Sequence, residues 1–384
     1  MITTNSKRGR IALMVAHCAG MIDLVALPVW VGTLVAQYHL DSQQAGLLAS
    51  LFLGGAVLAS AGLAPRFNPD TARLEAALGF GAAAALFGVA CFTTDFVMLA
   101  MLHAFCGVAT GAALSATHGT IARTANPHRM FAIVGMALGV FAIVFLGGTP
   151  QLVAKLGGAA LFQVFAGVMA LGAVACALAF PQPDADEAHQ PNAPRQPIPR
   201  AVWCGIVGIA CMGLVQSMTF SFLERAGSDR GFGVEAVTGV LIALGVVNLA
   251  PAPLAALLQK RFPAKSVLLV GPVIQALLVV VIMSSPQFAP YAAAASVFAA
   301  VMIFTHTFAF GLLARLDRSG RAMAATPAML MTGAAIGPLL GGTLVKTWGY
   351  ASLGPVAVAI GAIAVLCFSR IPGPVAMQRK ETLA

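Results

Sequence analysis

Residues Ala16–Gln37 read AHCAGMIDLVALPVWVGTLVAQ, and this stretch contains one charged residue, Asp23, near its middle. No other Asp, Glu, Lys or Arg lies between Arg10 and Asp41. An apolar run of this length can cross the hydrocarbon core of a bilayer, which is about 30 Å thick. A carboxylate at that depth is unfavourable to bury, and such groups usually serve transport or proton transfer. The stretch therefore predicts a membrane span that carries a functional acid.

Composition extends this prediction to the whole chain. Hydrophobic residues make up 59% of the 384 residues and charged residues 9%, whereas soluble domains have about a quarter of their residues charged. This excludes a water-soluble globular protein and predicts an all-α integral membrane protein with twelve transmembrane helices. The twelve apolar blocks are 11–36, 44–64, 74–93, 96–121, 131–152, 157–180, 200–225, 233–258, 266–284, 287–314, 322–345 and 351–369.

The net charge of +9 reflects topology and gives no support to nucleic-acid binding. With the N-terminus placed inside, eighteen basic residues lie on the inner side and four on the outer side, the asymmetry of the positive-inside rule. We therefore expect both termini in the cytoplasm, with membrane lipid as a partner. The outer residues are Lys155, Arg225, Arg230 and Lys346.

The cysteines give no sign of a metal or redox centre. All seven lie inside apolar blocks and none shows C-x-x-C spacing, so we predict neither a disulfide framework nor a metal site. No Walker-type phosphate-binding loop is present, so the sequence predicts no cofactor and gives no support to ATP coupling.

Two halves are separated by a segment of different composition. Residues 181–199 hold six prolines and no apolar periodicity, which predicts a cytoplasmic linker between an N-terminal six-helix lobe (1–180) and a C-terminal six-helix lobe (200–384). Short matches recur at nearly one offset: Leu146-Gly-Gly-Thr149 with Leu340-Gly-Gly-Thr343, and Arg66-Phe67 with Arg261-Phe262. These repeats predict two pseudo-symmetric bundles with a site between them.

This pattern resembles the major facilitator superfamily of transporters (MFS), and the resemblance covers essentially the whole chain. Pro65-Arg66-Phe67-Asn68 stands where the family has Asp-Arg-x-Gly, and His103-Ala-Phe-Cys-Gly107 stands where many members have R-x-x-x-G. The G-P-x-x-G-G motif of antiporters occurs as Gly337-Pro-Leu-Leu-Gly-Gly342, in the eleventh span instead of the fifth. The resemblance implies a small-molecule transporter that works by alternating access.

Asp23 and His103 are the candidates for proton coupling. Asp23 lies about twelve residues into the first span, about 18 Å at 1.5 Å per residue. In the family the first and fourth spans meet at the central cavity, so the resemblance implies that Asp23 and His103 form a titratable pair. The alternatives are a hydrogen-bonded structural carboxylate and a neutral histidine that bonds a backbone carbonyl.

Five further residues are candidates for substrate binding, and four arginines for an inner gate. Polar or aromatic side chains inside spans contact either a substrate or a neighbouring helix, where they act as hydrogen-bonding or packing groups. The arginines lie in inner loops, where topology alone also accounts for them. The substrate candidates are Trp30, Gln216, Ser217, Asn248 and His306; the gating candidates are Arg66, Arg129, Arg261 and Arg321.

The sequence favours a proton-coupled secondary transporter that exports amphipathic compounds or metabolites across a bacterial inner membrane as a monomer. Proton-coupled uptake of a small organic acid or another nutrient is the alternative. A transporter-like sensor is a further hypothesis. An intramembrane metalloenzyme based on His103, His118 and His306 is another, but no H-x-x-H or G-x-S-x-G pattern supports an enzyme.

Overall fold

The computed structural model describes residues 3–4, 6–182, 199–316 and 326–372, and within these ranges the chain is helical apart from turns and an isolated β-bridge between Thr3 and Gln182. Eleven helical segments in these ranges are long and apolar enough to cross a membrane. The remaining predicted span, 322–345, is represented by α15, Thr326–Trp348. The prediction of an all-α membrane protein is therefore confirmed.

The helices follow the predicted spans closely. Short 3₁₀ turns lie at Ala64–Arg66 and Tyr350–Ser352. The helices are α1 (Lys7–Gly20), α2 (Ile22–Gln37), α3 (Ser42–Leu63), α4 (Ala72–Ala90), α5 (Phe96–Ile121), α6 (Pro127–Leu156), α7 (Ala159–Ala179), α8 (Arg200–Ser221), α9 (Leu223–Asp229), α10 (Val234–Val247), α11 (Pro251–Leu258), α12 (Ala264–Ser284), α13 (Phe288–Leu316), α15 (Thr326–Trp348) and α16 (Leu353–Ser369).

Three spans that the sequence predicted as continuous are broken. The first is interrupted at Met21 (φ −109°, ψ 18°) and the seventh at Phe222 (φ −108°, ψ 5°), both outside the helical region. The eighth is interrupted between Asn248 and Pro251. Proline lacks a backbone N–H and its ring clashes with the preceding turn, which accounts for the third break. The first break places Asp23 in the first turn of a new helix.

Side-chain caps fix where several helices begin. At α3, Asp41 accepts a hydrogen bond from the Gln44 backbone while the Gln44 side chain accepts one from the Asp41 backbone, a capping box. Ser6, Asp95 and Asn126 cap α1, α5 and α6 in a similar way. The capping box fixes the start of α3 directly after Asp41.

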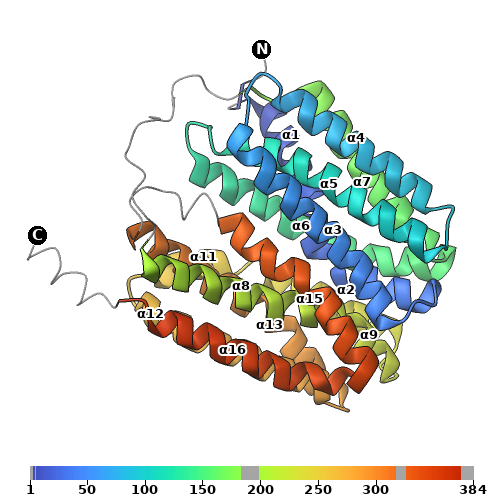
Figure 1. Cartoon of the computed structure of the whole chain (residues 1–384), viewed down its shortest axis with the longest axis vertical. Coiled ribbons are helices and arrows are strands. Elements are labelled where there is room, and N and C mark those ends of the chain that lie inside the picture. Colours follow the sequence, from blue (N-terminus) through green and yellow to red (C-terminus); the bar gives the residue numbers. More distant parts are fainter. Residues whose placement is uncertain (1–2, 5, 183–198, 317–325, 373–384) are drawn as a thin grey trace, which may run out of the picture.

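The helices α1–α7 gather on one side of the molecule and α8–α16 on the other (Figure 1). Across the boundary, α3 packs along α15, α6 packs against α10, and α2 packs against α8 and α9. Large apolar side chains are exposed on both halves, which suits contact with lipid tails. They include Leu58, Phe105, Leu178, Leu257 and Leu366.

The contact between α3 and α15 is made largely by backbone. A side chain at Gly46 would overlap the carbonyl oxygen of Pro338, and one at Gly342 would overlap that of Ser42. The backbone N–H of Leu339 also donates to Ser50 Oγ, at 3.0 Å. In lipid no hydrophobic force drives helices together, so close packing between small residues supplies the attraction. We call this contact the α3–α15 seam.

Candidate functional site

Asp23 lies at the break in the first span and is fully buried. It is about 24 Å along the helix axes from Lys7 and about 21 Å from Gln37, which is mid-membrane depth. Its carboxylate lies near the amides of Asp23 and Leu24, but neither oxygen makes a hydrogen bond of normal geometry to any described residue. A buried carboxyl group with no fixed partner is free to bind a proton or a cation.

His103 has both ring nitrogens engaged. Nδ1 lies 2.6 Å from the Leu99 carbonyl oxygen, and Trp30 Nε1 donates to Nε2 at 3.2 Å. A carbonyl only accepts and an indole N–H only donates, so Nδ1 carries the proton and the ring is neutral. His103 and Trp30 are both buried, and they stack with ring centroids 5.4 Å apart. This geometry favours a structural role for His103.

The expected pair of Asp23 and His103 does not form. No hydrogen bond or ion pair joins them, because His103 contacts Trp30, which lies seven residues beyond Asp23, about 10 Å further along α2. Trp30 sits in an aromatic core with Phe52 and Phe165, so it packs inside the N-terminal half.

Gln216 and Ser217 bond within the C-terminal half. The Gln275 amide donates to Gln216 Oε1 at 3.2 Å and to the Met212 carbonyl oxygen at 3.2 Å, joining α8 to α12. Ser217 Oγ donates to the Leu214 carbonyl oxygen at 3.3 Å and packs on Gly337 of α15. These contacts match the alternative in which polar groups hold helices together.

Asn248 and His306 keep free hydrogen-bonding capacity. Asn248 ends α10, and its buried Oδ1 has no hydrogen-bond partner among the described residues. The buried Nδ1 of His306, on α13, likewise makes no hydrogen bond of normal geometry within the described part of the chain. Asn248 follows α10, which packs against α6 of the other half, whereas His306 lies on α13, which packs against α10 within its own half.

The arginines proposed as an inner gate are solvent-facing where the structure describes them. Arg66 donates to the Gly62 carbonyl oxygen at 3.1 Å and so caps α3. Arg129 lines a cavity of about 70 Å³ at the predicted inner end, and Arg261 is exposed. Arg321 lies outside the described residues. Among the described residues, no hydrogen bond from Arg66, Arg129 or Arg261 crosses between the halves.

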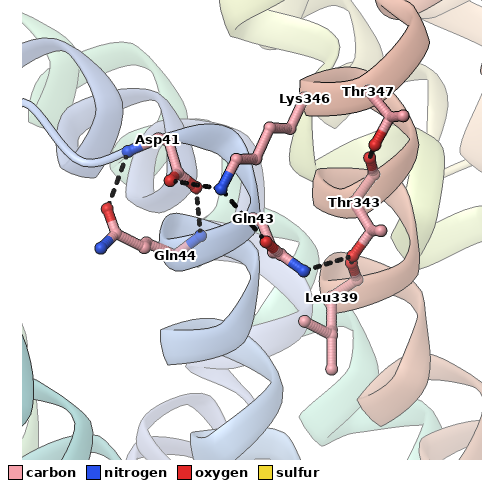
Figure 2. Close-up of polar contacts among 7 residues, drawn as sticks. All are labelled: Asp41, Gln43, Gln44, Leu339, Thr343, Lys346 and Thr347. Carbon is pink, nitrogen blue, oxygen red and sulfur yellow. Dashed lines mark hydrogen bonds and ion pairs between the residues drawn. The ribbon is translucent and has the colours of Figure 1, made fainter.

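Besides the Leu339–Ser50 hydrogen bond of the α3–α15 seam, a group of side-chain contacts crosses between the halves at the opposite, predicted outer end. Figure 2 shows Lys346 Nζ on α15 reaching Asp41 Oδ2 at 2.9 Å and Gln43 Oε1 at 3.3 Å. Gln43 Nε2 donates to Thr343 Oγ1 at 3.3 Å. We call Asp41, Gln43, Thr343 and Lys346 the outer latch. The sequence predicted gating candidates among the inner arginines and gave no such indication for these four residues.

A second contact that the sequence did not predict joins His17 to His118. His17 Nδ1 and His118 Nε2 are 3.0 Å apart, so one ring donates and the other accepts, linking α1 to α5. The two residues are 101 positions apart, and only the packing of α1 on α5 brings them together.

Comparisons with known proteins agree with this architecture. The family model of the Major Facilitator Superfamily matches residues 12–316, and no curated protein matches the chain in sequence. A bacterial homologue of the human lysosomal transporter Spinster, solved in an inward-facing and occupied conformation, has a similar structure, with a TM-score of 0.70 and 14% identity over 95% of this chain and 93% of that chain. The nucleoside transporter NupG gives a TM-score of 0.71 and 12% identity over 94% of this chain and 98% of that chain.

The family match spans most of the chain, and both solved structures cover nearly all of it. The resemblance expected from the sequence is therefore confirmed. The chain belongs to the Major Facilitator Superfamily and is a multi-pass membrane transporter of that family.

Proposed function

We propose that this transporter exports a small amphipathic solute in exchange for protons, and that Asp23 carries the proton. The observation that supports this most directly is the Asp23 carboxylate, which is buried at mid-membrane depth without a fixed partner among the described residues. A proton carrier needs such a group, because a permanent ion pair would hold the carboxylate in one protonation state.

In this proposal the lobes 1–180 and 200–384 rock about the linker 181–199, and Asp23 faces each side of the membrane in turn. Asn248 and His306 are the substrate contacts that we favour, because each keeps a buried polar atom that makes no hydrogen bond of normal geometry to the described residues. Asp23 is the only Asp, Glu, Lys or Arg that is fully buried among the described residues. This supports a neutral or cationic cargo over an acidic one.

The test is proton-driven flux in proteoliposomes with inward- and outward-directed pH gradients. The probes are ethidium for amphipathic export and lactate for organic-acid uptake. We expect ethidium to move against the proton flow in the wild type and Asp23→Asn to abolish this coupled flux. Wild-type rates in Asp23→Asn would refute the proton role, and lactate moving with protons would favour the uptake alternative.

His103→Gln serves as the comparison variant. Because both nitrogens of His103 are engaged in the aromatic core, we expect His103→Gln to lower stability while the surviving protein keeps proton coupling. Loss of coupling in folded His103→Gln would restore His103 to the proton pathway.

A further inference from the structure

Glu224 is a second acid at the boundary between the two halves. It is the second residue of α9, as Asp23 is the second residue of α2, and the two helices follow nearly identical backbone breaks at Phe222 and Met21. Gly32, which Glu224 faces, lies nine residues beyond Asp23, about 13 Å further along α2. Glu224 is therefore much closer to the predicted outer end than Asp23.

The carboxylate of Glu224 spans the boundary. Its Oε1 accepts a hydrogen bond from Ser228 Oγ at 2.9 Å. Its Oε2 reaches α2 of the other half and occupies the space where a side chain at Gly32 would project. The contact exists only because residue 32 has no side chain, so Glu224 and the α2 backbone pack directly on one another.

No cation forms an ion pair with Glu224 among the described residues. Arg225 pairs instead with Asp229, at 2.6 Å. Arg230 donates to the backbone carbonyl oxygens of Ile282 and Met283 on α12.

The remaining ionisable groups around α9 are engaged or distant. The Tyr291 hydroxyl of α13 donates to the Leu223 carbonyl oxygen, and the Tyr350 hydroxyl donates to Asp229. On α10 the nearest acid, Glu235, is exposed, and α2 contributes only Asp23. The Ser228 hydroxyl is thus the single side-chain donor that bonds the Glu224 carboxyl group in the described structure.

Ionisation of Glu224 and closure of the outer end therefore oppose each other. Glu224 is partly buried, and its carboxylate, held against the α2 backbone with one hydroxyl donor, is less well solvated there than in water, whereas the neutral acid loses less free energy in this position. Separation of α2 from α9 would admit water and favour the charged form. A proton that binds the closed state more tightly than the open state must shift the equilibrium towards closure.

We infer that Glu224 is a proton-binding site whose occupancy closes the predicted outer end of the transporter. The inference rests on the alternating access proposed above, but it assigns a proton site that is separate from Asp23. Protons from the outer side then both bind Glu224 and favour the state in which α2 and α9 are in contact.

The experiment measures the distance across the outer end as a function of pH. Thr94 and Thr347, both exposed at this end, are each replaced by a ketone-bearing amino acid, to which a spin label is attached. Because the label reacts with the ketone, the seven native cysteines can remain. Pulsed electron–electron double resonance in lipid nanodiscs then gives the ratio of short to long distances between the two labels at each pH between 5.5 and 8.5. Linkage through one carboxyl group changes this ratio at most ten-fold per pH unit.

In the wild type we expect the short distance to gain several-fold per unit as the pH falls. Glu224→Gln, which mimics the protonated acid, should stay closed, with under about a two-fold change over the whole range. Glu235→Gln, which removes the exposed acid on α10, should respond like the wild type. A wild-type pH response in Glu224→Gln, or no response in the wild type, would overturn the inference.

Gly32→Ala provides an independent variant if Glu224→Gln folds poorly. The added methyl group overlaps Oε2 of Glu224 and displaces this carboxylate from the α2 backbone, so Gly32→Ala should weaken the pH response of the distance ratio, whereas Gly239→Ala meets no atom of the described residues within 4 Å and should not. A full wild-type pH response in Gly32→Ala would count against the contact. If flux in proteoliposomes is not coupled to protons but the distance ratio keeps its Glu224-dependent pH response, the proposed function alone is refuted. If flux is coupled to protons but the distance ratio shows no Glu224-dependent pH response, this inference alone is refuted.

Discussion

Trp30 and His103 form a buried polar contact inside the N-terminal half, and each explains why the other is tolerated there. Both are buried, and their hydrogen bond of 3.2 Å satisfies the indole N–H and the unprotonated ring nitrogen together. Buried polar groups are stable only when paired in this way. His103 stands where, by resemblance, many family members have the arginine of R-x-x-x-G. Here that position holds a neutral side chain with a fixed tautomer.

Replacement of Trp30 by phenylalanine tests this contact. The variant keeps an aromatic ring but leaves His103 Nε2 without its donor, so we expect a loss of about 1–3 kcal/mol in stability. The measurement is the thermal denaturation midpoint in detergent. Trp203→Phe is the matched control, because the Trp203 side chain is 54% exposed on the surface of the helix bundle. Equal midpoints for the two variants would show that the Trp30–His103 bond contributes nothing.

At the scale of helices, the α3–α15 seam brings the two halves close enough for backbone groups to touch. The G-P-x-x-G-G motif has two faces: Gly337 and Gly341 pack on α8, while Pro338 and Gly342 pack on α3. A motif associated by resemblance with the fifth span of antiporters thus forms, in the eleventh span of this chain, a contact between halves.

Gly46→Ala should weaken this seam, because the new methyl group overlaps the Pro338 carbonyl oxygen. We expect a larger share of long distances between labels at Thr94 and Thr347, at every pH. Gly54→Ala, on the same helix, meets no atom of the described residues within 4 Å and serves as the control. If Gly46→Ala and Gly54→Ala give the same distance distribution, the seam does not hold the outer end closed.

For the whole molecule, the outer latch connects the first turn of α3 to the last turn of α15. The pair of Asp41 and Lys346 is solvent-accessible, with side-chain exposures of 37% and 47%, and such pairs contribute about 0–1 kcal/mol. Burial alone would raise the pKa of Asp41, but hydrogen bonds from Lys346 and from the Gln44 backbone hold it below its usual value.

The lowered pKa of Asp41 sets the pH range in which the latch acts. Its contribution to closure is present above the ordinary pKa of an aspartate, about 3.9, and is lost as the pH falls through the lowered value. Titration of Asp41 should therefore give the latch no pH response above about 5. A pH response in that range must come from other groups, such as Glu224.

Asp41→Asn isolates the charge, because asparagine caps a helix as well as aspartate does. We expect the closed-to-open ratio to fall by at most about five-fold, with its dependence on salt reduced. Lys346→Gln should behave alike, whereas Lys155→Gln, which removes an exposed cation at the same end, should not. The distance between the two labels at low and high salt decides this; an unchanged salt dependence in Asp41→Asn would exclude the pair as a latch.

The sequence predicted the spans and the buried acid because both depend on local composition. Asp23 stands out in any reading of residues 16–37, since no charged neighbour is near. The contacts between helices could not be predicted in this way. Asp41 and Lys346 are 305 positions apart, and Glu224 meets Gly32 only because α9 crosses α2. Hydropathy gives a span's length, but not the neighbour that each face meets.

The backbone character of the α3–α15 seam has a kinetic consequence. Where helices meet through long interlocked side chains, separation requires many rotamers to rearrange together, and this raises the activation barrier. Here Gly46, Gly342 and the Ser50–Leu339 hydrogen bond leave few side chains to rearrange. The rate at which the halves part should therefore depend weakly on temperature and mainly on how readily water reaches the exposed carbonyl oxygens.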